Sequence, residues 1–155
     1  MRARTKGLFF NLRRLAYNTP GFHRHNPIIL RMVSSMRSAW LTHKNHRYFH
    51  CNYSHLDLEQ LKAEIGAVDA HIAQQPAGSV LILTDVRGLS GSPQVVDLFK
   101  KSTVRTKPYI RKSCVIGIAL TGPKKVLFDL VMKFSGQSVT IFEDAERAKD
   151  WLVQS

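Results

Sequence analysis

Two short runs of almost continuously apolar residues constrain the fold of this chain more than any other feature. Residues 79–83 read Ser-Val-Leu-Ile-Leu, and residues 114–120 read Cys-Val-Ile-Gly-Ile-Ala-Leu. Runs of this length without alternating polar residues are typical of strands whose two faces are both buried. Such strands lie inside a sheet that is covered by helices, so we expect an α/β fold.

Helix-start signals lie on both sides of these runs. Asp57 and Gln60 have the spacing of a capping box, and an apolar stripe at helical spacing follows them. Ser92 is a good N-cap, and Pro93 stands at the first helical position, where its missing N–H costs nothing. That helix must end before Pro108. The expected helices begin at Asp57, Ser92, Gly122 and Asp144.

Strands and helices alternate from about residue 46 to the end of the chain. Residues 47–52 and 138–142 are expected to form two further strands. Single helices between strands imply right-handed crossovers, and therefore a largely parallel sheet of four to five strands. Residues 35–45 can add an antiparallel edge strand. One inward apolar face of the third helix is expected from Val126, Leu127, Leu130, Val131 and Phe134.

The charge distribution divides the chain in two. The first 56 residues contain ten Lys and Arg and no acidic residue, so they carry ten of the twelve net positive charges. We expect residues 1–44 to be a basic extension, helical or disordered, and residues 45–155 to be the domain. Basic, acid-free segments bind nucleic acid or membrane surfaces, direct proteins to organelles, or remain solvated. Contact with a polyanion or a membrane through residues 1–47 is one interpretation, and a misplaced start codon is another.

The remaining composition favours a cytoplasmic, non-enzymatic protein. Cys51 and Cys114 lack CxxC spacing and form no disulfide framework, which is typical of a reducing compartment. No apolar run reaches the roughly 18–20 residues that span a bilayer. We find no Ser-His-Asp order, phosphate loop or pair of carboxylates suited to acid–base catalysis, so we expect no enzyme and no cofactor.

A group of histidines invites a metal interpretation, which we reject. Five possible ligands lie between residues 43 and 55, but the adjacent His50 and Cys51 point to opposite faces of a strand. Closed zinc sites normally have tighter paired spacing. We therefore expect no metal site among His43, His46, His50, Cys51 and His55.

Polar residues at the ends of two strands are candidates for a binding surface. Asp85 follows the central strand, and Asn52, Tyr53 and Ser54 follow its neighbour. Open α/β sheets bind ligands at the carboxyl ends of their strands, so these side chains can line a polar crevice. The simpler interpretation, which we favour, is that Asp85 accepts hydrogen bonds from backbone N–H groups of the next turn.

A second basic cluster lies after the helix that begins at Ser92. Part of it is structural, because cations stabilise the negative end of a helix dipole. The whole cluster is a candidate anion-binding surface. Its members are Lys100, Lys101, Arg105, Lys107, Arg111 and Lys112.

Several short runs, taken in order, resemble the small STAS/SEC14-type domains, also described as SpoIIAA-like. The runs cover residues 79–86, 107–109, 115–117, 132–136 and 148–152. The resemblance covers about residues 46–155. It implies a regulatory or binding module that works by contact with a protein partner and is not an enzyme. The resemblance to SEC14-type domains in particular implies binding of an apolar ligand or of a membrane surface.

The resemblance also implies a regulatory surface near Ser90 and Ser92. Anti-sigma-factor antagonists of this family are phosphorylated at a serine in an Asp-Ser-Ser/Thr-Gly motif, at the start of the helix after the central strand. Residues 84–93 are the matching region, and Ser92 stands at the helix start, but the motif itself is missing. We therefore interpret Ser92 as an N-cap.

Overall fold

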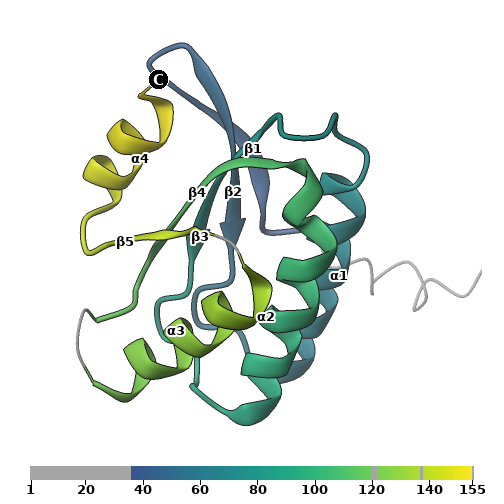
Figure 1. The fold of residues 1–155 in the computed structure, drawn as a ribbon, viewed down its shortest axis with the longest axis vertical. Coiled ribbons are helices and arrows are strands. Elements are labelled where there is room, and N and C mark those ends of the chain that lie inside the picture. Colours follow the sequence, from purple (N-terminus) through teal and green to yellow (C-terminus); the bar gives the residue numbers. More distant parts are fainter. Residues whose placement is uncertain (1–35, 120–121, 137, 155) are drawn as a thin grey trace, which may run out of the picture. The chain divides into compact units, whose positions relative to one another are not determined.

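The computed structural model describes residues 36–119, 122–136 and 138–154, which form a five-stranded sheet flanked by helices (Figure 1). The strands are β1 (Ala39–His43), β2 (His46–Asn52), β3 (Val80–Asp85), β4 (Ile110–Ile116) and β5 (Thr140–Phe142). The helices are α1 (Leu58–Ile72), α2 (Pro93–Thr106), the short 3-10 helix η2 (Lys107–Tyr109), α3 (Pro123–Ser135) and α4 (Ala145–Val153). The predicted alternation is present, and the α/β fold class is confirmed.

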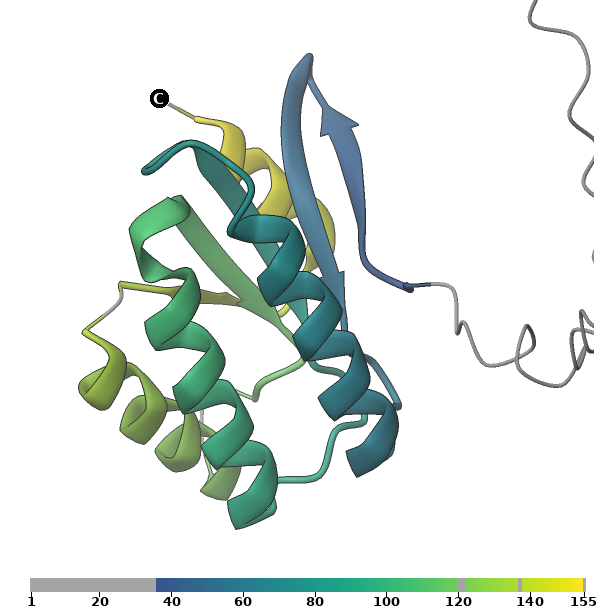
Figure 2. The same cartoon turned by 90° about the vertical axis from the view of Figure 1, so that its right-hand side faces the viewer.

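The strands lie in the order β1-β2-β3-β4-β5, so each strand is next to its neighbour in sequence. Strands β2 to β5 are parallel, and β1 is antiparallel to β2. Each connection between neighbouring parallel strands is right-handed, and each leads to the next strand in the same direction across the sheet. Connections of this kind place their helices on the same face of the sheet. Helices α1, α2 and α3 accordingly cover one face, and α4 covers the other (Figure 1, Figure 2).

The alternation of side chains along the strands divides the apolar residues between two cores. Phe49 and Ile82 pack with Leu61 and Ile65 on the face that carries α1. The other core holds Tyr48, Leu81, Leu83, Cys114 and Ile116 against Ala148, Leu152 and Val153 of α4. Neighbours in the chain, such as Tyr48 and Phe49, therefore enter different cores.

The helix ends use the side chains that the sequence indicates. Asp57 accepts a hydrogen bond from the backbone N–H of Gln60 at 2.8 Å, and Gln60 Oε1 accepts one from the N–H of Asp57 at 3.1 Å. Ser92 Oγ accepts from the N–H of Val95 at 3.3 Å, so Ser92 is an N-cap as predicted. Helix α3 ends at Ser135, and its C-cap is Gly136, whose φ of 60° lies in the left-handed region that glycine tolerates.

Strand β4 begins upstream of the predicted run 114–120, at Ile110, and ends within it, at Ile116. The strand includes Lys112, whose Nζ donates to the carbonyl of Trp151 at 2.7 Å and lies 4.2 Å from the centre of its ring. A lysine with these partners is compatible with a covered strand, because its stem packs while its charge is satisfied. Gly117, with a φ of 91°, then turns the chain out of the sheet. Strand β5, Thr140–Phe142, is shorter than the predicted strand 138–142.

Strand β1 extends the folded unit upstream of the predicted boundary. Lys44 and Asn45 have φ values of 48° and 64°, as a two-residue turn between antiparallel strands requires. Trp40 packs edge-on against Phe49, with ring centres 5.1 Å apart. The boundary between residues 44 and 45 cuts this hairpin and was therefore placed too late. The rest of the predicted extension, residues 1–35, lies outside the described residues.

Cys51 and Cys114 are free, buried thiols that belong to different cores, so they form no disulfide with each other. Burial raises the pKa of each thiol to about 12, so neither ionises near neutral pH. Within the described ranges, no helix has both the length and the apolar character needed to cross a membrane.

Candidate functional site

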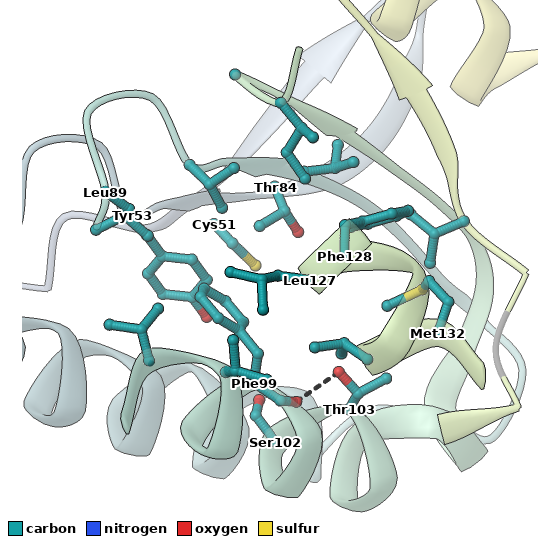
Figure 3. A pocket seen from close by; sticks show the side chains of 18 of the residues that line it. Cys51, Tyr53, Thr84, Leu89, Phe99, Ser102, Thr103, Leu127, Phe128 and Met132 are labelled. Carbon is teal, nitrogen blue, oxygen red and sulfur yellow. Dashed lines mark hydrogen bonds between the residues drawn. The ribbon is translucent and has the colours of Figure 1, made fainter. Parts of the chain in front are cut away.

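A cavity of about 160 Å³ lies between the sheet and helices α2 and α3 (Figure 3). Successive side chains of a strand point to opposite faces of the sheet, so every second residue at the ends of β2, β3 and β4 points toward the cavity. This floor contains Cys51, Tyr53, Ile82, Thr84, Ser113 and Val115. The walls include Val96, Phe99 and Thr103 of α2, with Leu127, Phe128, Val131 and Met132 of α3.

The cavity exists because the second half of α2 turns small side chains toward the sheet. Ser102, Thr103 and Thr106 stand where large apolar residues would fill the space. The Thr103 and Thr106 hydroxyls donate to carbonyls one turn earlier in α2, at 2.7 and 3.0 Å. Ser102 donates to Asp69 of α1. Because these hydroxyl hydrogens are engaged within the protein, the wall is largely apolar despite its composition.

The lining carries no charge near neutral pH. Among the described residues that line the cavity there is no Asp, Glu, Lys, Arg or His. Burial raises the pKa of Tyr53 well above its ordinary value, as it raises that of Cys51. The Tyr53 and Thr84 hydroxyls are hydrogen-bonding neighbours of the Cys51 thiol, and all three side chains point into the same space (Figure 3). A charged ligand would therefore be desolvated there without a counter-charge.

The predicted polar crevice is divided between the two faces of the sheet. Asn52 and Asp85 are register partners, and their side chains lie on the face that carries α4. Tyr53 points the other way, into the cavity. Ser54 is buried and donates to Asn52 Oδ1 at 2.7 Å. The four residues therefore do not form one surface, because neighbours along an extended chain alternate in direction.

Asp85 has the turn role that we favoured. It ends β3 rather than following it, and its carboxylate accepts from the Arg87 backbone N–H at 3.1 Å. The Arg87 guanidinium donates to both carboxylate oxygens, at 2.6 to 3.1 Å. Burial alone would raise the pKa of Asp85, but the hydrogen bonds and charge of Arg87 outweigh it and lower the pKa below its ordinary value. Burial also lowers the pKa of the nearby His50.

The two candidate serines differ in position. Ser90 lies at the rim of the cavity, in the loop between β3 and α2. Ser92 caps α2 through its own side chain. A regulatory role for either serine stays a prediction. The hydroxyl of Ser92 can cap the helix in the unmodified protein and still accept a phosphate, so the cap does not decide the question.

The predicted basic cluster is spread over several structural roles. Lys101 pairs with Asp97 one turn earlier at 2.8 Å. Arg105 pairs with Asp69 of α1. Lys112 satisfies carbonyls at the end of α4, while Arg111 points outward from the neighbouring position. Anion binding by the six residues stays a prediction, and these ion pairs reduce the charge available for it.

The histidines also have separate surroundings. His43 Nε2 lies 2.6 Å from Asp150 Oδ1 and joins the β1–β2 turn to α4. His50 and Cys51 belong to opposite faces of β2. No group of three potential ligands converges in the part of the chain that the structure describes.

Sequence reasoning missed the cavity and most of its lining. Three hydroxyl residues on the inward side of α2 were the available signal, since the apolar stripe of that helix fails after Phe99. The expected inward face of α3 was partly wrong. Leu127 and Val131 line the cavity as expected, whereas Val126 and Leu130 are 68% and 38% exposed.

The cavity is the site in which shape and chemistry converge best among the described residues. It lies between two helices and three strands, has no charged side chain in its lining, and has a few polar groups on a mostly apolar lining. Sites of this composition are typical of small-molecule binding. Comparison with protein-family models, with curated proteins and with solved structures finds no match for this chain.

Proposed function

We propose that this chain is a cytoplasmic, non-enzymatic binding module of the STAS/SEC14 type. It takes one small apolar molecule into the cavity beneath α2 and α3 and acts on a protein partner. The observation that carries the proposal is the uncharged cavity of about 160 Å³, walled by Phe99, Leu127 and Val131.

The apolar lining supports the presence of an occupant. An apolar molecule that enters the cavity removes apolar surface of the ligand and of the protein from water, which is favourable. Thr103 lies in the wall, so a larger side chain at this position would reduce the space.

Contact with a protein partner is supported by the outer side of the same helix. Val126 and Leu130 of α3 are one turn apart and exposed, whereas Leu127 and Val131 line the cavity. Helix α3 is thus apolar toward the ligand site and toward solvent. A partner that docks on Val126 and Leu130 would contact the helix that also encloses the ligand.

The test uses full-length protein and fluorobenzene, a neutral ring that is small enough for the cavity. We expect saturable binding, seen as a shift of the ¹⁹F resonance, in the parent protein. Thr103→Leu fills the cavity and should weaken binding at least tenfold. The matched control is Val104→Leu, because Val104 adjoins Thr103 in α2 but is 59% exposed. Absence of binding to the parent, or equal loss in both variants, would contradict the proposal.

A second candidate function concerns the basic residues upstream of Asp57. Ten basic and no acidic residues favour a polyanion or an anionic membrane as partner. Within the described part, Arg37 donates to the Ser54 carbonyl, Lys44 pairs with Asp150 and Arg47 lies over Trp40, so these three cations also have structural roles.

Salt dependence tests this second function. Full-length protein should bind heparin or vesicles of anionic lipid with an affinity that falls steeply between 50 and 200 mM salt, roughly as counterion release requires. Protein that lacks residues 1–35 should lose this binding. Binding that ignores salt, or that survives the deletion unchanged, would exclude the segment as the binding element.

A further inference from the structure

The lining of the cavity defines its ligand more narrowly, on the premise that the proposed function is correct. Size is the first restriction. A dry cavity of roughly 150 Å³ in a protein core is filled by a single benzene molecule. The cavity here, at about 160 Å³, therefore has room for one ring with one small substituent.

Aromatic side chains are the second restriction. The Tyr53 and Phe99 rings meet edge to face, with centres 5.5 Å apart and planes at 68°. Phe128 and Met132 of α3 approach from the opposite wall (Figure 3). Aromatic rings and a thioether sulfur prefer to surround another flat ring, because edge-to-face and sulfur–ring contacts add to area burial. This wall favours an aromatic ligand over a branched aliphatic one.

An unsatisfied hydroxyl is the third restriction. Ser113 lines the cavity and is only 7% exposed, yet its hydroxyl makes no hydrogen bond among the described residues. The hydroxyls of Ser102, Thr103 and Thr106 differ, since each donates within the protein. A buried hydroxyl without a partner is costly. A ligand that carries one hydrogen-bonding group can supply that partner.

Charge is the last restriction. Because the lining contains no ionised side chain near neutral pH, a carboxylate or ammonium group on the ligand would have no counter-ion. We infer that the ligand is a neutral, single-ring aromatic alcohol of the phenol class. Its ring lies among Tyr53, Phe99 and Phe128, and its hydroxyl exchanges a hydrogen bond with Ser113.

The experiment compares phenol, toluene and benzoate on full-length protein at pH 7, with dissociation constants from ligand-observed NMR titration. We expect phenol and toluene to bind and benzoate not to bind. Ser113→Ala should weaken phenol binding about tenfold, the loss of one hydrogen bond to a buried group, and leave toluene within twofold. Ser79→Ala is the matched control, because Ser79 donates to the Pro76 carbonyl outside the cavity.

The outcomes separate this inference from the proposed function. If no ring compound binds, and Thr103→Leu changes nothing, both fail. If toluene binds but Ser113→Ala leaves phenol affinity unchanged, the cavity is a ligand site while a water molecule satisfies Ser113, and the inference is wrong. Binding of benzoate as tight as that of phenol would also overturn it. Circular dichroism of Ser113→Ala confirms that the variant is folded.

Discussion

Replacing Trp151 by alanine tests how α4 is held on the sheet. The Trp151 ring lies 5.5 Å from that of Phe142, and the Lys112 ammonium lies over it at 4.2 Å. Trp151 is only partly buried, whereas the adjacent Leu152 is fully buried. Trp151 therefore closes the edge of the second core, and Leu152 fills its centre.

The expected magnitudes follow from these positions. Truncating a buried Trp to Ala costs about 3–5 kcal/mol, and truncating a buried Leu costs about 2–5 kcal/mol. Because part of the Trp151 ring stays in solvent, we expect Trp151→Ala to lower the free energy of unfolding by about 2–3 kcal/mol, including the contact with Lys112. Leu152→Ala should cost about 3–4 kcal/mol, because no part of its side chain is hydrated.

Urea unfolding of full-length protein, followed by circular dichroism, measures both values by linear extrapolation. Val104→Ala provides the control for a truncation at an exposed position and should stay within about 0.5 kcal/mol of the parent. If Trp151→Ala is as stable as the parent within the same margin, α4 does not dock on the sheet as described. Equal losses for Trp151→Ala and Val104→Ala would refute the reasoning in the same way.

Three further predictions concern a cap, an ion pair and the chain boundary. Ser92→Ala should lower the free energy of unfolding in urea by about 1 kcal/mol, whereas Ser92→Asp should leave it unchanged, because Asp is also a good N-cap. Phosphate found on Ser92 in cells, together with loss of partner binding in Ser92→Asp, would instead indicate regulation by phosphorylation. Because Arg87 lowers the folded-state pKa of Asp85, the carboxylate stabilises above its unfolded pKa and ceases to do so as pH falls through the folded pKa. The stability advantage of the parent over Asp85→Asn should thus shrink below about pH 4, and a constant difference would contradict this. Removing residues 1–35 should preserve cooperative unfolding, whereas removing residues 1–44 deletes β1 and should clearly lower the urea concentration at the unfolding midpoint. Equal midpoints for the two deletion variants would show that β1 adds no stability.

The elements that were predicted correctly rest on local chemistry. Asp57, Ser92 and Pro93 determine where two helices start, because a cap needs only its own first turn. The apolar run 79–83 indicates a covered strand, because both of its faces are buried by whichever helices follow. These inferences need no knowledge of which elements pack together.

The features that were missed depend on long-range contacts. The start of β4 includes Lys112, whose carbonyl partners belong to Trp151 of α4 and to Gln154 directly after that helix, both distant in sequence. The rotation of α3 was ambiguous because apolar residues lie on several sides of that helix, so helical spacing fits more than one inward face. The cavity depends on the absence of side-chain volume near Thr103, and no local pattern records such an absence.

Helix α3 connects the two halves of the proposed function. Leu127 and Val131 line the cavity, while Val126 and Leu130 are exposed. If a partner binds α3 better when the cavity is filled, then by linkage it must raise ligand affinity by the same factor. If the ligand binds free protein and partner-bound protein with equal affinity, α3 does not couple the cavity to the partner surface. Only a difference between these two affinities can make partner binding depend on the ligand. Measuring phenol affinity with and without the partner therefore decides whether ligand binding is regulatory or only structural.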